Sequence, residues 1–332
     1  MTGPDIQIGR ELLDRDVLPA RPDRAAVAIL TQPGAAHIAR MVQGAIGVRS
    51  EILEVPDGEP AKSLPEAERV YTELNRLGLT RHDTVVCVGG GTVTDLGGFV
   101  AATYLRGVEA VYVPTTVLGA VDAATGGKTG VNVGGKNLVG VFAEPTRVVI
   151  DIGVLEELPE DVRREGLAEA LKAGLIADPA LVELLEHDGL GADLEPIVRR
   201  AVAVKVDVVS GDFRESGRRA ILNYGHTIGH AVEVAAGLGH GSAIAVGMVA
   251  AGVVSELLVG FPDAARQHHL IEHLGLPTTA TFDRARVRDL IGLDKKRDTT
   301  GARMVLLERI GTPVVRPVGE AELEQALDEI TA

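Results

Sequence analysis

Strand-like and helix-like patterns alternate through the first half of the chain. Four short runs rich in β-branched and apolar residues predict buried strands, and apolar residues at helical spacing predict the helices between them. Strands that alternate with helices indicate a parallel sheet covered on both faces. The predicted strands are 25–30, 50–55, 84–88 and 110–113, and the predicted helices are 35–45, 63–77 and a helix from the glycines at 89–91 to about 105.

The pattern changes near residue 151, where long helical periodicities replace the alternation. Only the end of the chain again looks strand-like, as a hairpin around Gly311. We therefore predict an α/β Rossmann-like nucleotide-binding domain over 1–150 and a mostly α-helical domain over 151–332, with the functional site between them. The predicted elements of the second domain are helices at 161–176, 194–209, 218–235 and 242–258 and strands at 303–307 and 314–318.

Composition excludes several classes of protein. The 332 residues are 45% hydrophobic, which fits a folded chain of about two domains, and the net charge of −14 disfavours nucleic acid and anionic membranes as partners. The most apolar run, 243–254, is too short to span a bilayer and predicts a buried helix. Cys87 is the single cysteine, and residues 1–16 carry no export signal, so we expect a cytoplasmic protein.

A triple glycine at 89–91 directly follows a predicted strand and opens a helix. Free backbone amides and the helix dipole favour a phosphate at such a place, and Asp95 lies one turn further on. The pattern is not G-x-G-x-x-G, and a tight turn without a ligand is the alternative. Nucleotide binding is the interpretation we favour.

The segment 122–137, DAATGGKTGVNVGGKN, contains two Gly-Gly-Lys units. Glycine-rich backbone beside a lysine suits a bound anion, and Lys128 and Lys136 have a buried-looking context with no carboxylate after Asp122. A flexible surface loop is the alternative reading of the same residues.

The segment 218–233, RRAILNYGHTIGHAVE, places polar residues on one helical stripe. Their spacings are +4, +3, +4 and +3, and the positions between them from 220 to 232 carry no charge. A charged stripe on an otherwise buried helix must line a wet cleft, since unpaired buried charge is costly. Lone helical histidines are usually structural, but two on such a stripe favour a functional site. The stripe consists of Arg219, Asn223, His226, His230 and Glu233.

A third histidine, His240, lies between glycines, and Glu169 and Lys172 share a face of the helix predicted at 161–176. Two imidazoles and a carboxylate with an open fourth position suit a catalytic divalent metal, most naturally zinc. HTIGH lacks the glutamate base of the H-E-x-x-H zinc proteases, which disfavours that class. The run Asp294-Lys295-Lys296 is either a solvated turn or a segment that closes the site with a positively charged side chain.

These motifs together resemble the 3-dehydroquinate synthases, a branch of the sugar-phosphate cyclases. The resemblance runs from about residue 56 to 296 and rests on DGEPAK, GGGTVTDLGGF, PTT, VDAATGGKTGVN, GLAEALKAG, RAILNYGHTIGHAVE, the HG pair and DKK. It implies a cytoplasmic shikimate-pathway lyase that converts 3-deoxy-D-arabino-heptulosonate 7-phosphate to 3-dehydroquinate and phosphate. NAD would be a recycled cofactor, with one divalent metal, zinc or cobalt.

The resemblance also implies roles for individual residues. The metal ligands would be Glu169, His226 and His240. NAD would be held by Asp57, Gly58, Glu59, Lys62, Gly90, Gly91, Asp95, Thr115, Thr116, Lys128, Lys136 and the backbone around Leu155. The substrate carboxylate would be held by Lys205 and Arg219, the ring hydroxyls by Asp122, Asn137, Lys172 and Glu215, and the phosphate by Asn223, His230, Lys128 and Lys295 or Lys296. Arg106 would reach into the site from a second subunit, which implies a homodimer.

The sequence departs from the family pattern at three places. It has DAATGG where Ser-Ser-Val more often follows the aspartate, Ser242 where a glutamate is usual, and no acidic residue at 30–32 near the expected adenine ribose. Three alternatives remain: an aminodehydroquinate, valiolone or deoxy-inosose synthase, a glycerol-dehydrogenase-like oxidoreductase, and a non-catalytic NAD-binding protein. The intact ligand set and Lys172 argue against the last of these.

Overall fold

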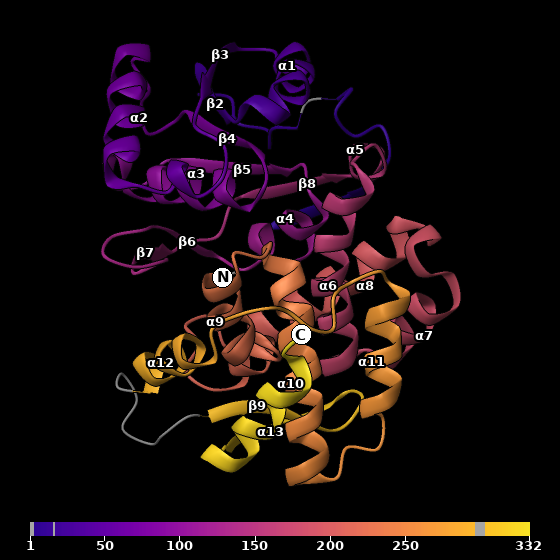
Figure 1. Ribbon diagram of the computed structural model, residues 1–332. Helices are drawn as coiled ribbons and strands as arrows, with labels where there is room; N and C mark the ends of the chain where they lie inside the picture. The colour runs from indigo at the N-terminus through magenta and orange to yellow at the C-terminus, as the bar shows by residue number, and fades with distance from the viewer. Residues whose placement is uncertain (1–2, 16, 296–302) are drawn as a thin grey trace. The chain divides into compact units, whose positions relative to one another are not determined.

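A computed structural model describes residues 3–15, 17–295 and 303–332, with side chains as far as residue 292 in the last helix before 303 (Figure 1). The chain forms two compact units, Met1–Pro159 and Glu160–Ala332. The boundary expected near residue 150 lies inside a strand of the first sheet, Arg147–Asp151, so the units divide a few residues later.

The first unit is built on a six-stranded parallel sheet of order β1-β8-β5-β4-β2-β3. Every residue of β2 and β4 is buried, because both are central strands of a covered parallel sheet. The sheet confirms the predicted α/β class, and the edge strand β1 and its neighbour β8 were not predicted. The strands are β1 (Asp5–Gly9), β2 (Ala26–Thr31), β3 (Arg49–Glu54), β4 (Thr84–Gly89), β5 (Glu109–Pro114) and β8 (Arg147–Asp151).

Helices connect these strands, and their ends follow the local sequence. The Ser63 hydroxyl accepts a hydrogen bond from the Glu66 amide at the start of α2, and Gly78 ends that helix with φ +68°. A short hairpin of β6 (Lys128–Val131) and β7 (Val139–Phe142) packs against α3. The helices are α1 (Ala36–Ala45), α2 (Leu64–Leu77), α3 (Gly91–Thr103), α4 (Val117–Val121) and α5 (Ile152–Glu156), with short 3₁₀ turns that include η2 (Glu59–Ala61), η3 (Tyr104–Arg106) and η4 (Ala123–Thr125).

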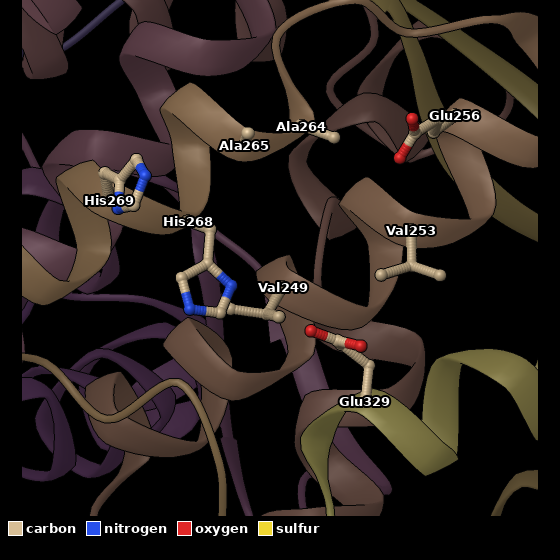
Figure 2. Close-up of a pocket in the computed structure, with 8 residues that line it drawn as sticks. All are labelled: Val249, Val253, Glu256, Ala264, Ala265, His268, His269 and Glu329. Atoms are coloured by element: carbon tan, nitrogen blue, oxygen red, sulfur yellow. The ribbon is translucent and has the colours of Figure 1, made fainter.

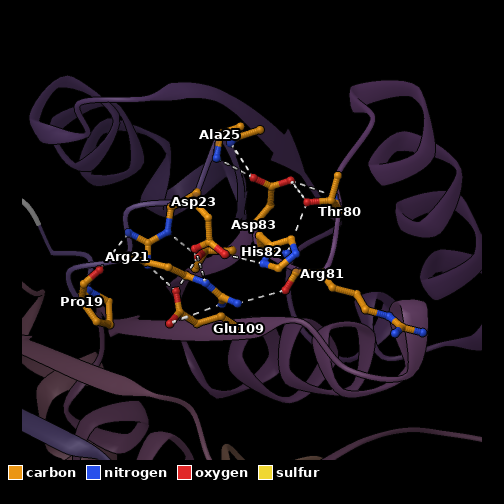
Figure 3. A network of polar contacts seen from close by, with 12 residues as sticks. Pro19, Arg21, Asp23, Ala25, Thr80, Arg81, His82, Asp83 and Glu109 are labelled. Carbon is orange, nitrogen blue, oxygen red and sulfur yellow. Dashed lines mark hydrogen bonds and ion pairs between the residues drawn. The ribbon is translucent and has the colours of Figure 1, made fainter.

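A polar network ties the amino ends of the central strands together (Figure 3). Asp83 accepts hydrogen bonds from the amides of Ala25 and Ala26 at 2.9 and 2.7 Å and from the amide and hydroxyl of Thr80 at 2.7 and 2.8 Å. Burial opposes ionisation of this carboxyl, but the hydrogen bonds outweigh it and hold the pKa of Asp83 below its ordinary value. Beside it, buried Arg24 pairs with Glu109. The network holds together the amino ends of the central strands, at the end of the sheet opposite to the glycine turn.

The second unit is mostly helical, as predicted, with a hairpin of β9 (Arg303–Arg309) and β10 (Thr312–Pro317). α10 runs through its middle and packs against α6, α9, α11 and α13 (Figure 1). The helices are α6 (Glu160–Ala177), α7 (Pro179–Asp188), α8 (Leu194–Gly211), α9 (His226–Ala236), α10 (His240–Val259), α11 (Ala264–His273), α12 (Arg284–Lys295) and α13 (Glu320–Ile330), with the 3₁₀ turns η5 (Gly189–Gly191) and η6 (Arg218–Asn223).

The central helix α10 is longer than the apolar run 243–254 suggested. By length and composition it could cross a membrane, yet 67% of its apolar window is buried inside this unit. Its side chains are therefore already covered by protein, and α10 is the core helix of the unit.

The prediction of one continuous helix over 218–235 is wrong. The segment is divided into η6 and α9, and Gly225 between them has φ +77°. A Cβ at Gly225 would lie 2.7 Å from the Met248 side chain and 3.0 Å from the Met248 amide. The close approach of α10 therefore leaves no room for a residue larger than glycine at this position. Arg219 and Asn223 consequently do not share one helical stripe with the histidines.

Candidate metal and nucleotide sites

Three predicted metal ligands converge within the second unit. The Nε2 atoms of His226 and His240 each lie 3.4 Å from the same oxygen, Oε1 of Glu169. Ligand atoms on a tetrahedral zinc ion at about 2.0–2.1 Å are separated by about 3.3 Å, so these spacings match a shared ion. Glu169 comes from α6, His226 begins α9 and His240 begins α10. The cluster confirms the predicted convergence of three distant residues.

The chemistry of Glu169 also fits a metal. Both of its oxygens are buried, and neither accepts a hydrogen bond of normal geometry from the described residues. A buried carboxylate left in that state is costly, and a divalent cation would satisfy it. Lys172 forms a close ion pair with Glu169 one helical turn away, which compensates the charge of the carboxylate.

The opposite nitrogen of each histidine is already engaged. His226 Nδ1 lies 3.1 Å from the carbonyl oxygen of Tyr224, and His240 Nδ1 lies 3.1 Å from Oε2 of Glu233. Both partners are acceptors, so each Nδ1 carries a proton and each Nε2, which faces Glu169, is the nitrogen left to bind a metal. This tautomer is the one that a metal-binding imidazole needs.

Electrostatics keep Glu169 and His226 in the protonation states that bind metal, whereas His240 is held protonated. Burial opposes ionisation of Glu169, but Lys172 and the imidazoles outweigh it and hold the pKa of Glu169 well below its usual range. Burial and the charge of Lys172 lower the pKa of His226 to about 3. Burial also opposes the charge on His240, but the neighbouring carboxylates of Glu169 and Glu233 outweigh it and raise the pKa of His240 to about 9. Metal binding would therefore displace a proton from His240.

Close helix packing brings the ligands together. A Cβ added to Gly247 of α10 would lie 2.1 Å from the carbonyl oxygen of Gly225 and 2.7 Å from the amide of Gly229. Real Cβ atoms do not approach backbone that closely, so only glycine allows α9 and α10 to cross at this point. The crossing sets the position of His226 relative to α10, which carries His240.

The predicted substrate residues of the second unit form two groups: His230 lies beside the metal cluster, whereas Lys205, Glu215, Arg219 and Asn223 come from α8, η6 and the turn between them. The rings of His230 and His226 lie 5.0 Å apart, with His230 exposed, whereas Lys205 and Arg219 are buried. Asn223 donates to Glu215 at 3.3 Å, and Arg219 donates to the Phe213 carbonyl at 2.8 Å. The helix with Lys205, α8, packs against both η6 and α6. Lys295 ends α12 without a described side chain, and Lys296 lies outside the described residues.

Several predicted nucleotide-binding residues meet in the first unit. The Nζ atom of buried Lys62 lies 2.6 Å from Oδ2 of Asp95 and also bonds Asn137. Burial raises the pKa of Asp95 above its ordinary value although Lys62 opposes this. Asn132 donates to Glu59 at 2.6 Å, so the turn that contains Lys136 folds over η2. Asn137, predicted to contact the substrate ring, lies beside the nucleotide residues.

The glycine turn lies where the predicted phosphate site requires it. Gly89 at the end of β4 pairs with Pro114 at the end of β5, and the Thr115 amide donates to the Gly89 carbonyl at 2.9 Å. Gly90 is the N-cap of α3, and no side chain of the described residues caps that helix. Thr116 caps α4 by accepting from the Gly119 amide at 3.0 Å. The start of α3 is thus compatible with a phosphate.

The remaining predicted residues differ in their exposure. The expectation that Lys128 and Lys136 are buried is wrong, because both lie exposed on the β6–β7 hairpin and its turn, outside the core of the sheet. Leu155 is fully buried, so only its backbone could meet a cofactor. Four further predicted residues are exposed or half-buried: Asp57, Gly58, Arg106 and Asp122.

A surface pocket of about 360 Å³ lies elsewhere in the second unit, between α10, α11 and α13 (Figure 2). Its lining includes Val249, Val253, Glu256, His268 and Glu329. None of the predicted site residues lines it. The pocket is therefore separate from the metal cluster.

Sequence reasoning missed the residues that orient the ligands. Glu233 was recognised as part of the polar stripe but was given no role, and its spacing from His230 was the available signal. The Tyr224 carbonyl and Glu165 had no signal in the sequence, since their contacts arise from tertiary packing.

The fold and the two clusters together define a class. Similar solved structures are a 2-deoxy-scyllo-inosose synthase complexed with carbaglucose-6-phosphate, NAD⁺ and Co²⁺ (TM-score 0.89, 28% identity, 97% of this chain and 95% of that one) and the 2-epi-5-epi-valiolone synthase of Streptomyces hygroscopicus subsp. jinggangensis with NAD⁺ and Zn²⁺ (TM-score 0.90, 27%, 99% and 97%). The chain has the fold of these cyclases. A probable glycerol dehydrogenase from Sinorhizobium meliloti shares the fold alone (TM-score 0.66, 17%, 99% and 96%).

Sequence comparisons narrow this class to one family. The N-terminal family model of 3-dehydroquinate synthase matches residues 52–165, and the C-terminal one matches 166–297. The 3-dehydroquinate synthase of Nocardia farcinica is 45% identical over 92% of this chain and 87% of its own length, and that of Thermobifida fusca is 47% identical over 84% and 79%. The chain belongs to the 3-dehydroquinate synthase family.

Proposed function

We propose that this chain converts 3-deoxy-D-arabino-heptulosonate 7-phosphate to 3-dehydroquinate and phosphate, as a lyase of the shikimate pathway. The observation that carries the proposal is the placement of both Nε2 atoms 3.4 Å from Oε1 of Glu169. Family membership at 45–47% identity supports it.

One divalent metal would be held by Glu169, His226 and His240. When bound, such a metal polarises the substrate oxygen at the carbon that is oxidised and then reduced. The first unit would hold NAD, which supplies a reversible hydride acceptor. Lys62, Asp95 and the glycine turn would bind its ribose and phosphates, since they combine a buried cation, a carboxylate and uncapped backbone amides. Zinc and cobalt both suit the ligand set.

The chain's own residues position the substrate and balance its charge. Lys205 and Arg219 would bind the carboxylate, and a charge-assisted bond to Arg219 would fix the orientation of the sugar acid. Asn223 and His230 would bind the phosphate with Lys128 and Lys295 or Lys296. Ring hydroxyls would contact Asp122, Asn137, Lys172 and Glu215. Catalysis would then depend on orientation and electrostatic stabilisation.

We also propose a homodimer in which Arg106 completes the site of the second subunit. Arg106 is exposed at the end of η3 with φ +67°, in a turn held by the hydrogen bond from the Gly107 amide to the Tyr104 carbonyl. The β6–β7 hairpin exposes Val133, Leu138, Val139 and Phe142, and exposed apolar side chains favour a protein partner. A monomer by light scattering, or wild-type activity of Arg106→Ala, would contradict this proposal. A cytoplasmic location is part of the same proposal.

The main alternative is another cyclase of the same fold, such as a deoxy-inosose or valiolone synthase. Lys205 and Arg219, the two buried cations that the family resemblance assigns to a carboxylate, favour a substrate that carries one. The discriminating experiment measures phosphate release from the heptulosonate phosphate and from glucose 6-phosphate, and NAD reduction by glycerol, with the same metal-loaded protein. Release from the heptulosonate phosphate supports the proposal, and turnover of either other substrate alone would contradict it.

A further inference from the structure

Glu165 of α6 contacts the first turn of α10, the turn that begins with His240. Its carboxylate accepts a hydrogen bond from the Ser242 amide at 3.1 Å and another from the Ser242 hydroxyl. Both partners are partly buried, and the residues are 77 positions apart in the chain. The amide is one that the start of a helix otherwise leaves without a partner, so the contact stabilises this turn.

The two glycines on either side of His240 make this contact possible. A Cβ at Gly239 would lie 2.7 Å from a Glu165 carboxylate oxygen, and a Cβ at Gly241 would lie 2.0 Å from the Glu165 carbonyl oxygen. The backbone around His240 therefore lies directly against Glu165. At this separation of α6 and α10, a side chain on Gly241 would collide with the backbone of α6.

Glu165 also precedes the metal ligand Glu169 by one turn of the same helix. We infer that Glu165 is a positioning residue: through Ser242 it holds His240 at the distance from Glu169 that a shared metal requires. Helix α6 then determines the position of two ligands, Glu169 directly and His240 through the start of α10. Glu233 fixes the ring of His240 from the other side, by its bond to Nδ1.

This inference rests on the metal site proposed above, so the test includes that site. Metal-free protein is titrated with Co²⁺ against a competing chelator, and the visible spectrum of the bound ion is recorded for wild type, Glu165→Ala, Ser242→Ala, the double variant and Glu169→Gln. We expect the dissociation constant for Co²⁺ to rise about 10-fold or more in Glu165→Ala, with an altered spectrum, and to rise less in Ser242→Ala, which keeps the bond from the amide. The double variant should be little worse than Glu165→Ala, because Ser242→Ala removes only the hydroxyl part of the contact that Glu165→Ala removes completely.

A matched control separates positioning from general stability. Asp193→Ala removes the side-chain cap of α8, another helix start in the same unit, where Asp193 accepts from the Glu195 amide at 3.1 Å. It should lower the melting temperature without changing the Co²⁺ affinity or spectrum. The inference is overturned if the Glu165 and Ser242 variants bind Co²⁺ as wild type does while Glu169→Gln binds weakly. If Glu169→Gln also binds as wild type does, the metal site itself is contradicted.

Discussion

His240 and Glu169 lie with Nε2 3.4 Å from Oε1, although 71 residues separate them in the chain (240 − 169). The carboxylate of Glu169 is buried, and neither of its oxygens accepts a normal hydrogen bond from the described residues, so it needs another partner. The same oxygen lies 3.4 Å from Nε2 of His226. A cation is the partner that satisfies all three groups at once.

Arg219→Ala should weaken substrate binding far more than Arg218→Ala. Arg219 is 2% exposed, whereas the Arg218 side chain is 53% exposed and pairs with Asp207 at the surface. Loss of a charge-assisted hydrogen bond costs about 1.5–3 kcal/mol, which corresponds to an increase in KM of roughly 10- to 100-fold. Steady-state phosphate-release kinetics of both variants measure this. Equal kinetics for the two arginine variants would place the carboxylate site elsewhere.

Asp83→Asn should destabilise the first unit in a pH-dependent way. The pKa of Asp83 is lowered in the folded protein, so its stabilisation is present above the unfolded pKa of about 3.9 and is lost as the pH falls through the folded value. At pH 7 we expect a loss of about 1–3 kcal/mol, since charge-assisted bonds to buried amides are weakened. Urea unfolding at several pH values tests this: the gap between wild type and variant should narrow below about pH 4. A gap that widens in acid would refute the assignment.

Gly247→Ala should disrupt the crossing of α9 and α10. The added methyl group would meet the Gly225 carbonyl oxygen at 2.1 Å, so one helix must shift, at a cost of about 1–3 kcal/mol or more. Gly292→Ala is the matched control in the same unit, because a Cβ there meets nothing within 4 Å and alanine favours a helix. Melting temperatures and Co²⁺ affinity should fall only in the Gly247 variant. Unchanged metal affinity in that variant would show that the crossing does not position His226.

Local pattern was sufficient for much of the fold, but not for contacts that depend on tertiary packing. The apolar periodicity predicted β2, β4 and α6 because their burial follows directly from local sequence. It failed at β1, whose burial is partial and which pairs with β8, more than 130 residues further along the chain. A parallel partner that distant leaves no trace in local spacing.

The candidate site shows the same division. Residue type and glycine context identified Glu169, His226 and His240, and the structure brings them together. The break at Gly225 was missed because a helical stripe reveals neither its positive φ nor the close approach of α10 that leaves no room for a side chain there. Lys128 was expected to be buried because no carboxylate follows Asp122 in its segment, but the hairpin leaves it exposed.

The most direct test of the account restores activity to chelator-treated protein with measured amounts of Co²⁺ or Zn²⁺. Phosphate release from 3-deoxy-D-arabino-heptulosonate 7-phosphate should vanish without metal and should return in full at one ion per chain in the wild type. Glu169→Gln, folded to the same extent by circular dichroism, should stay inactive at that concentration. Full turnover by the metal-free wild type, or restored turnover by Glu169→Gln at one ion per chain, would contradict the central claim.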